Sequence, residues 1–319
     1  MTTESVTRSL QRARNGVGVG GGGAPARNRR NKALNHGTTF FFFALPSLFL
    51  LLLLNLYPVI YAGFQSVHDG DLIQPGNFIG LRNYLTVLQT ADFWRAARFT
   101  VIFTVVGVFG SWAVGLGIAL LLRTRIPANP VFKVLLLLPW VVPTVVSATA
   151  WNWLVATPQA PLPVIAKAIG FGDVSFLGDP LAAQVLVCIF KVWISFPFMM
   201  MMLSSALAAV DTNVYEASKV DGAGTWQTFT RITLPMISRT TYVSWILMTI
   251  FCVNDFPTIY LLTGGGPVNA TQSLVVMAYQ TVFANQQVGP GVAIAFIMTI
   301  VLVIVSVVLY RQIRKSSIE

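Results

Sequence analysis

The chain has 319 residues, of which 55% are hydrophobic and only 10% are charged, and its formal net charge is +10. A mean hydropathy of +0.70 is too high, and the charged fraction too low, for an ordinary soluble protein. The composition therefore indicates a membrane protein. A strongly basic chain can also bind nucleic acid, and the positions of the basic residues decide between these two classes.

Residues 1–37 are predicted to form a flexible cytoplasmic arm. They hold a glycine-rich run from Gly16 to Gly23 among basic residues, and such a composition cannot bury a core. The run is not a phosphate-binding loop, because no strand is expected before it and no Gly-Lys-Ser/Thr follows it.

Six apolar stretches follow, each long enough for a membrane-spanning helix, which takes about 20 mainly apolar residues. The first is too long for a signal-peptide core, so we expect it to be a retained anchor. The prediction is an all-α polytopic membrane protein with a six-helix domain over residues 38–310 and a cytoplasmic tail over residues 311–319. The stretches are 38–64, 97–122, 133–156, 181–209, 240–262 and 288–310.

Basic residues concentrate before the first span and in every second segment after it. An alternating bias of this kind follows the positive-inside rule, so both termini are expected in the cytoplasm of a bacterial or archaeal cell, with the chain in its plasma membrane. The bias also explains the net charge without nucleic acid. The opposite segments hold only Arg82, Arg95, Arg98 and Lys167, whereas sixteen of the 21 Lys and Arg lie on the predicted cytoplasmic side: Arg8, Arg12, Arg14, Arg27, Arg29, Arg30, Lys32, Arg123, Arg125, Lys133, Lys219, Arg231, Arg239, Arg311, Arg314 and Lys315.

The segments on the outer side, 65–95 and 157–180, are rich in turn residues and too short for a separate solute-binding domain. Cys188 and Cys252 fall inside predicted spans, where packing is their expected role and no disulfide is expected. No His-Glu-x-x-His, nucleophile elbow or metal-ligand cluster occurs, so we predict no catalytic residue, no metal and no cofactor bound by this chain.

The predicted cytoplasmic loop over residues 210–239 specifies a short helix. Asn213 is expected to be the N-cap, Glu216 can complete a capping box, and Gly222 and Gly224 are expected to end the helix after about two turns. Pro235 is expected to break the turns before the fifth span. From these signals alone, the segment is either a simple connector or a surface that another protein approaches.

Two ionisable residues fall inside predicted spans, Lys191 in the fourth and Asp255 in the fifth. Such groups form either a mutually satisfied ion pair that joins two helices or a polar patch in a pore. Four prolines are predicted to interrupt the third, fourth and fifth spans: Pro139, Pro143, Pro197 and Pro257. Aromatic residues suited to stacking on sugar rings occur at a similar depth: Trp140, Trp151, Trp153, Trp193, Phe198, Phe256 and Tyr260.

The cytoplasmic loop resembles the EAA signature of ABC-importer permeases. Glu216-Ala217-Ser218 is followed after three residues by Gly222, after nine more by Ile232, and then by Leu234-Pro235, so the match departs only at Ser218. In that family the short helix docks in a cleft of the ATPase subunit. The resemblance implies this coupling role for Glu216, Ala217, Ser218, Asp221, Gly222 and Gly224.

Further stretches resemble the first, maltose-type permease of the sugar and glycerol-phosphate importers. They are residues 78–84, 138–144, 193–200 and 254–267. The resemblance implies a type I importer fold, a second permease, two ATPase subunits that bind ATP and Mg, an extracytoplasmic solute-binding protein, and a sugar such as maltose or trehalose. The alternatives are a glycerol-phosphate-type solute or polyol, an ion-coupled secondary transporter with Asp255 as its proton site, and an intramembrane enzyme.

The resemblance also implies a solute site inside the membrane domain. Lys191, Cys252 and Asp255 depart from the pattern of the maltose-type site, where neutral amides are expected. The implied residues are Trp140, Thr144, Lys191, Ser195, Phe198, Phe251, Cys252 and Asp255.

Overall fold

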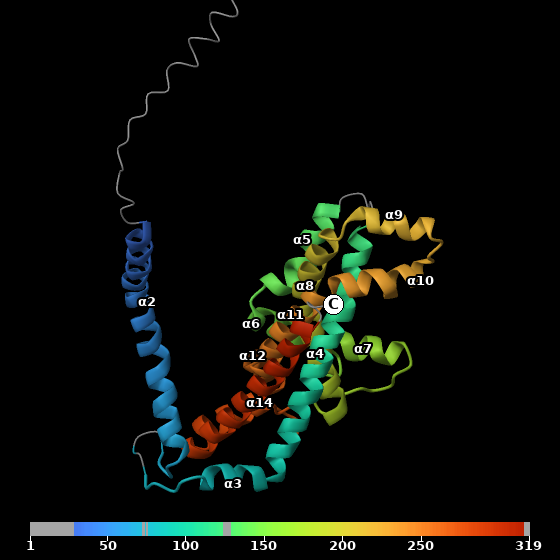
Figure 1. The fold of residues 1–319 in the computed structure, drawn as a ribbon. Helices are drawn as coiled ribbons and strands as arrows, with labels where there is room; N and C mark the ends of the chain where they lie inside the picture. The colour runs from blue at the N-terminus through green and yellow to red at the C-terminus, as the bar shows by residue number, and fades with distance from the viewer. Residues whose placement is uncertain (1–28, 72–73, 75, 124–128, 316–319) are drawn as a thin grey trace, which may run out of the picture. The chain divides into compact units, whose positions relative to one another are not determined.

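The computed structural model describes residues 29–71, 74, 76–123 and 129–315, and over these residues the chain is helical, with only an isolated bridge between His68 and Phe78. Figure 1 shows the fold. The chain divides at Val59 and Ile60 into two compact units. Helix α2 (Arg29–Ser66) begins within the residues assigned to the arm from the sequence, and residues 1–28 lie outside the described part.

Every predicted span has a helical counterpart. Among the described residues, five helices are long and apolar enough to cross a membrane, and a sixth span is made if one bent pair of helices is counted together. The five are Phe41–Ser66 within α2, α4 (Ala91–Arg123), α8 (Pro180–Ala208), Thr225–Val253, and Val288–Arg311 within α14 (Val288–Lys315).

The third span, predicted over residues 133–156, is broken into two helices. Helices α5 (Asn129–Val141) and α6 (Thr144–Val155) are bent by 89° relative to each other. Pro143 precedes α6 with an extended backbone and Pro139 lies in the last turn of α5, so two N–H groups are missing from the ladder around the bend. The interruption predicted at these two prolines is confirmed.

The fifth span is also interrupted, because α11 (Leu234–Val253) ends before Asp255 and α12 (Phe256–Thr263) begins after it. Pro257 lies in the first turn of α12, where its missing N–H costs no helical hydrogen bond. The interruption predicted at Pro197 is wrong, since α8 continues through it to Ala208. A single proline removes one hydrogen bond, which packing on both sides can offset.

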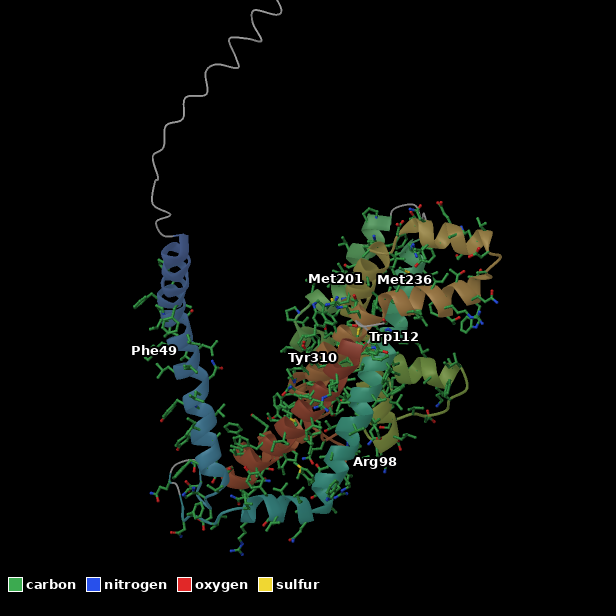
Figure 2. The ribbon with its side chains drawn as sticks, in the orientation of Figure 1. Phe49, Arg98, Trp112, Met201, Met236 and Tyr310 are labelled. Carbon is green, nitrogen blue, oxygen red and sulfur yellow. The ribbon has the colours of Figure 1, made fainter. Side chains whose placement is uncertain are left out.

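Close contact between α4 and α8 forms the core of the second unit. A Cβ atom at Gly110 would lie 2.6 Å from Val192 Cγ2, and one at Gly115 would lie 2.7 Å from Met199 Cβ. Glycine at these positions lets the two backbones approach, as is common between membrane helices. Figure 2 shows side chains filling the spaces between these helices, with Trp112 labelled on α4.

Two short helices lie at opposite ends of this unit (Figure 1). Helix α9 (Thr212–Val220) is at one end and helix α3 (Arg82–Gln89) is at the other. The α3 end is held by Asn83, which is buried and donates from Nδ2 to the carbonyls of Ser66 at 2.8 Å and His68 at 2.9 Å. Sequence comparison with the importer class marked this stretch but not the role of Asn83, which is to satisfy two buried backbone acceptors.

The glycine contact predicts a difference between two neighbouring substitutions in α4. Gly115→Ala forces a Cβ against Met199 and Met200 and should lower the free energy of unfolding by about 1–3 kcal/mol. A Cβ at Gly117 would meet nothing within 4 Å, so Gly117→Ala should leave the free energy of unfolding unchanged or raise it slightly. Thermal unfolding of the two purified variants checks this, and equal melting temperatures would contradict the close approach of α4 and α8.

Candidate functional site: a surface helix and a membrane-embedded cluster

Helix α9 begins at Thr212, and its N-cap is Asp211. The Asp211 carboxylate accepts a hydrogen bond from the backbone N–H of Asn213 at 2.9 Å. The prediction of Asn213 as the N-cap is therefore wrong, because a stronger acceptor lies two residues earlier.

The C-terminus of α9 is closed as predicted by Gly222. Its φ of +76° is in the left-handed region, its N–H donates to the Lys219 carbonyl at 3.1 Å, and the N–H of Ala223 donates to the Ser218 carbonyl at 2.9 Å. This pair of bonds is a Schellman motif, which glycine adopts without a Cβ clash. Gly224 has a negative φ and is the N-cap of the short helix α10 (Thr225–Thr228).

The residues of the signature do not all face the same way. Glu216, Ala217, Asp221, Gly222 and Gly224 are exposed, and among the described residues no hydrogen bond or ion pair is made by the Glu216 side chain. Ser218 is buried, and its hydroxyl donates to the Tyr215 carbonyl at 2.8 Å. The residue at which the chain departs from the signature therefore packs against its own protein and does not contribute to the exposed face.

Two apolar side chains next to the signature were missed from the sequence. Val220 is 88% exposed and Trp226 is 73% exposed. Large apolar residues in an otherwise polar loop were the available signal. These two side chains, together with the exposed residues Glu216 and Ala217, are called the α9 surface below.

The α9 surface is connected to the membrane helices through Tyr215. The Arg123 guanidinium, at the end of α4, lies 4.2 Å from the centroid of the Tyr215 ring. Thr233 Oγ1 donates to the Tyr215 hydroxyl at 3.4 Å from the π-helical turn η1 (Phe229–Thr233). That turn precedes Pro235 and leads into α11 without a break, so the predicted break at this proline is wrong. The altered hydrogen-bond register accommodates the missing N–H.

Inside the membrane domain, Lys191 and Asp255 form a buried ion pair. Lys191 Nζ donates to Asp255 Oδ2 at 2.6 Å, and their side chains are only 7% and 9% exposed. Asp255 also accepts from the backbone N–H of Thr258 at 3.0 Å and from its hydroxyl at 2.8 Å, so it caps α12. Of the two alternatives raised by the sequence, the structure shows the mutually satisfied pair that joins α8 to α12.

The pair is surrounded by small and weakly polar groups. Cys252 is buried in the hydrophobic core. A Cβ atom at Gly107 would lie 2.7 Å from the Cys252 sulfur and 3.1 Å from Lys191 Cγ. Both Cys252 and Cys188 are free thiols. Ser195, one turn along α8 from Lys191, is buried, and its hydroxyl has no hydrogen-bond partner in the described part of the chain.

Three of the predicted solute-site aromatics form a separate cluster. Trp140 stacks on Phe198 with ring centroids 5.3 Å apart, and Phe251 lies 6.1 Å from Trp140 and 5.8 Å from Phe198. Trp140 is 38% exposed and Phe251 is 42% exposed, so both present ring surface, unlike the buried ion pair. Thr144 is half-buried at the first residue of α6, just beyond the bend that follows Trp140.

The other aromatics noted in the sequence lie elsewhere. Trp151, Phe190 and Trp193 pack together, Phe256 and Tyr260 stack with Tyr279 nearby, and Trp153 is 70% exposed. The eight predicted solute-site residues thus include one aromatic cluster, one buried ionic cluster, and the separate side chains of Ser195 and Thr144.

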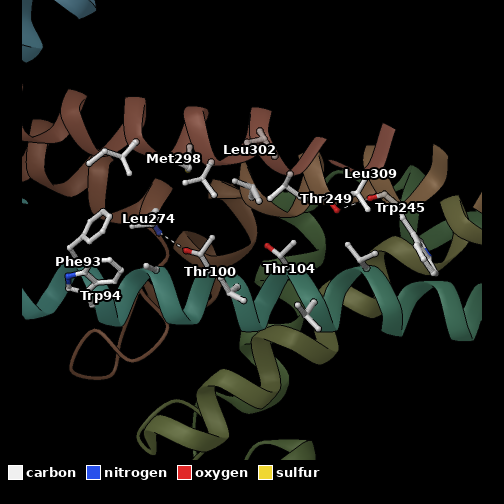
Figure 3. A pocket seen from close by; sticks show the side chains of 18 of the residues that line it. Phe93, Trp94, Thr100, Thr104, Trp245, Thr249, Leu274, Met298, Leu302 and Leu309 are labelled. Atoms are coloured by element: carbon white, nitrogen blue, oxygen red, sulfur yellow. Dashed lines mark hydrogen bonds between the residues drawn. The ribbon is translucent and has the colours of Figure 1, made fainter. Parts of the chain in front are cut away.

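A groove of about 450 Å³ lies away from these residues, between α4 and α14 (Figure 3). Phe93, Leu274, Met298 and Leu302 are among its lining residues, which are almost entirely apolar, and none of the eight predicted solute-site residues lines it. Such a surface suits hydrocarbon or another apolar helix better than a hydroxylated solute.

In the part of the chain that the structure describes, no three His, Cys, Asp or Glu residues gather to hold a metal ion. The described residues therefore provide hydrogen-bonding groups, aromatic rings for stacking, and an exposed helix, α9.

Residues 113–317 match the family described as binding-protein-dependent transport system inner membrane component. The chain is therefore a multi-pass membrane subunit of a transport system and not an enzyme. It belongs to that family, which confirms the resemblance to ABC-importer permeases.

Relatives and solved structures agree with this assignment. The chain is 36% identical to the trehalose/maltose transport system permease protein MalF of Thermococcus litoralis, over 85% of this chain and 92% of that protein. It is 32% identical to the diacetylchitobiose uptake system permease protein DasB of Streptomyces coelicolor, over 91% and 90%. A chain of the bacterial alginate ABC transporter, in complex with alginate pentasaccharide-bound periplasmic protein, matches with a TM-score of 0.77 at 19% identity, covering 90% of this chain and 98% of that one. The last match confirms the predicted importer fold.

The buried pair predicts an unequal effect of single and double substitutions. Lys191→Met leaves the Asp255 carboxylate buried without its cation and should lower the free energy of unfolding by about 3–5 kcal/mol. The double variant Lys191→Met/Asp255→Asn should recover most of this loss, because asparagine keeps an acceptor for the Thr258 N–H. Thermal unfolding of purified protein checks it, and equal instability of the single and double variants would contradict a stabilising pair.

Proposed function

We propose that this chain is one permease subunit of an ATP-driven importer that takes up a di- or oligosaccharide. It forms the translocation path with a second permease subunit, two ATPase subunits bind ATP and Mg, and an extracytoplasmic solute-binding protein delivers the sugar. The α9 surface is the observation that carries the proposal, because a rigid, exposed helix tied to α4 and α11 can transmit a partner's movement to the membrane helices.

The choice of a sugar is supported by the aromatic cluster of Trp140, Phe198 and Phe251 and by the named solutes of the relatives, trehalose or maltose and diacetylchitobiose. The partly exposed rings of Trp140 and Phe251 offer apolar faces on which a sugar ring can stack. The Ser195 hydroxyl, which has no hydrogen-bond partner among the described residues, supplies a hydrogen-bonding group about one turn from Phe198 on the same helix.

The ion pair weighs against two alternatives. A phosphate-bearing solute needs a cation, and Lys191 is already paired with Asp255 at 2.6 Å. A proton site needs a carboxylate that is open to a proton donor, whereas both oxygens of the buried Asp255 side chain are already engaged by Lys191 and Thr258. We propose that Lys191, Cys252 and Asp255 support the solute site by holding α8, α11 and α12, and that the solute contacts lie nearer Trp140.

Transport by this subunit requires that the sugar bind differently to two conformations. A ligand shifts an equilibrium only by its differential affinity for the two states. The interruptions after Val141 and Val253 lie at the ends of helices that carry Trp140 and Phe251, so movement there alters the aromatic cluster. Both termini and the α9 surface are proposed to lie in the cytoplasm, where ATP is hydrolysed.

The coupling role is tested by Glu216→Ala in the complex reconstituted with its ATPase and second permease. Glu216 is exposed, so the variant should assemble, but solute-stimulated ATP hydrolysis and uptake should fall by about tenfold or more, as for a residue central to an interface.

The matched control is Asp173→Ala. This substitution also removes an exposed carboxylate, but from the loop between α7 (Pro161–Ala168) and α8, outside the α9 surface. It should behave as the unsubstituted complex does. Uptake that continues without nucleotide, or normal coupling in Glu216→Ala, would contradict the proposed role.

The solute site is tested by two tryptophan substitutions. Trp140→Ala removes the ring stacked on Phe198 and should lower uptake of the transported sugar by about tenfold, equivalent to the loss of about 1.4 kcal/mol of binding. Trp153→Ala removes a ring that is 70% exposed and outside the cluster, and should change uptake less than twofold. Equal uptake by the two variants, at equal amounts of assembled complex, would place the sugar elsewhere.

A further inference from the structure

A pocket of about 370 Å³ lies near the α3 end of α4, between α4, the start of α8 and the loop that follows α12. Arg95 and Arg98 line it from α4, Gln184 lines it from α8, and Val268 and Asn269 line it from the loop. Figure 2 labels Arg98 on this part of α4. The pocket is at the opposite end of the unit from α9 and shares no residue with the eight predicted for the solute site.

The loop that forms one wall of this pocket is held in place. Gln184 Nε2 donates to the Ala270 carbonyl at 2.6 Å, which ties the loop to α8. Thr271 donates from its hydroxyl to the Gly266 carbonyl at 2.6 Å and from its N–H to the Gly265 carbonyl at 3.1 Å. Val268 and its neighbour Asn269 have φ of 47° and 59°, uncommon for residues with a Cβ, and Val268 is 84% exposed. The loop therefore presents an apolar side chain in a fixed position beside the arginines.

The charges around the pocket are not balanced. Arg95 pairs with Asp92, and both side chains are at least half exposed. Arg98 is also exposed and makes no ion pair with any residue that the structure describes. The nearby Asp179 accepts from the N–H of Ala182 and so caps α8. The pocket keeps an unneutralised guanidinium, a group suited to paired hydrogen bonds with a carboxylate.

We propose that this pocket docks an acidic side chain on the surface of the extracytoplasmic solute-binding protein, with Arg98 as its main partner and Val268 packing beside it. The inference rests on the proposed function. A neutral sugar gives no reason for a guanidinium here. A small free anion would leave Val268 without a contact, whereas a protein surface can cover Val268 while its acidic side chain pairs with Arg98, and arginine is enriched at protein interfaces.

The test is ATP hydrolysis by the reconstituted complex, titrated with the solute-binding protein that stimulates the unsubstituted complex. Arg98→Glu places like charges together at the interface, so the concentration of binding protein at half-maximal stimulation should rise by about tenfold or more, with the maximal rate unchanged. The salt dependence of that concentration should also become weaker. Arg82→Glu is the matched control, since Arg82 is exposed on α3 but does not line the pocket, and it should shift the value less than twofold.

Several outcomes separate this proposal from the proposed function. If no solute-binding protein stimulates the unsubstituted complex, both are overturned. If stimulation is normal but Arg98→Glu and Arg82→Glu behave alike, only the docking pocket is overturned. If Arg98→Glu leaves the half-maximal concentration unchanged and instead lowers transport of an anionic solute, the pocket binds solute and not protein. Recovery of the half-maximal concentration on replacing one acidic residue of the binding protein by arginine would identify the partner side chain and support the proposal.

Discussion

The close approach of α4 and α8 is the contact on which the membrane domain depends. Glycines on α4 remove the side chains that would otherwise separate the two helices, and Gly107 lies directly against Lys191 and Cys252. Because α4 comes this near, Lys191 is enclosed, with Asp255 as its ion-pair partner and the face of Phe103 nearby, the ring centroid lying 5.8 Å from Lys191 Nζ. A larger residue at Gly107 would disturb helix packing and the ion pair together.

The ion pair in turn fixes where the fifth span is interrupted. Asp255 follows the end of α11 and is the N-cap of α12. Its carboxylate therefore marks where α12 begins and also links the start of α12 to α8 through Lys191. The bend before Thr144 has no comparable anchor in side-chain charge and follows from prolines. The two interruptions therefore have different physical origins, one electrostatic and one steric, although both lie beside the aromatic cluster.

The membrane spans and the α9 helix could be predicted from the sequence, and the predictions that were wrong have physical causes. Length and hydropathy predicted the spans, and the capping residues and glycines of the loop predicted the α9 helix, because these features are local. Pro197 and Pro235 were misjudged because the effect of a proline depends on packing and on the hydrogen-bond register around it. The Lys191–Asp255 pair joins residues 64 positions apart, and pairing could be raised only as one alternative. The exposure of Val220, the inward direction of Ser218 and the anchoring role of Asn83 depend on tertiary contacts that no local pattern encodes.

The inward direction of Ser218 has a consequence for how such subunits diverge. A partner protein cannot sense a side chain that it does not touch, so replacement of alanine by serine at this position changes only the internal packing under the helix, where the hydroxyl bonds to the Tyr215 carbonyl. For the coupling role proposed above, this position is therefore free to vary with the packing of the membrane domain beneath the helix, while Glu216 and Ala217 remain on the exposed face.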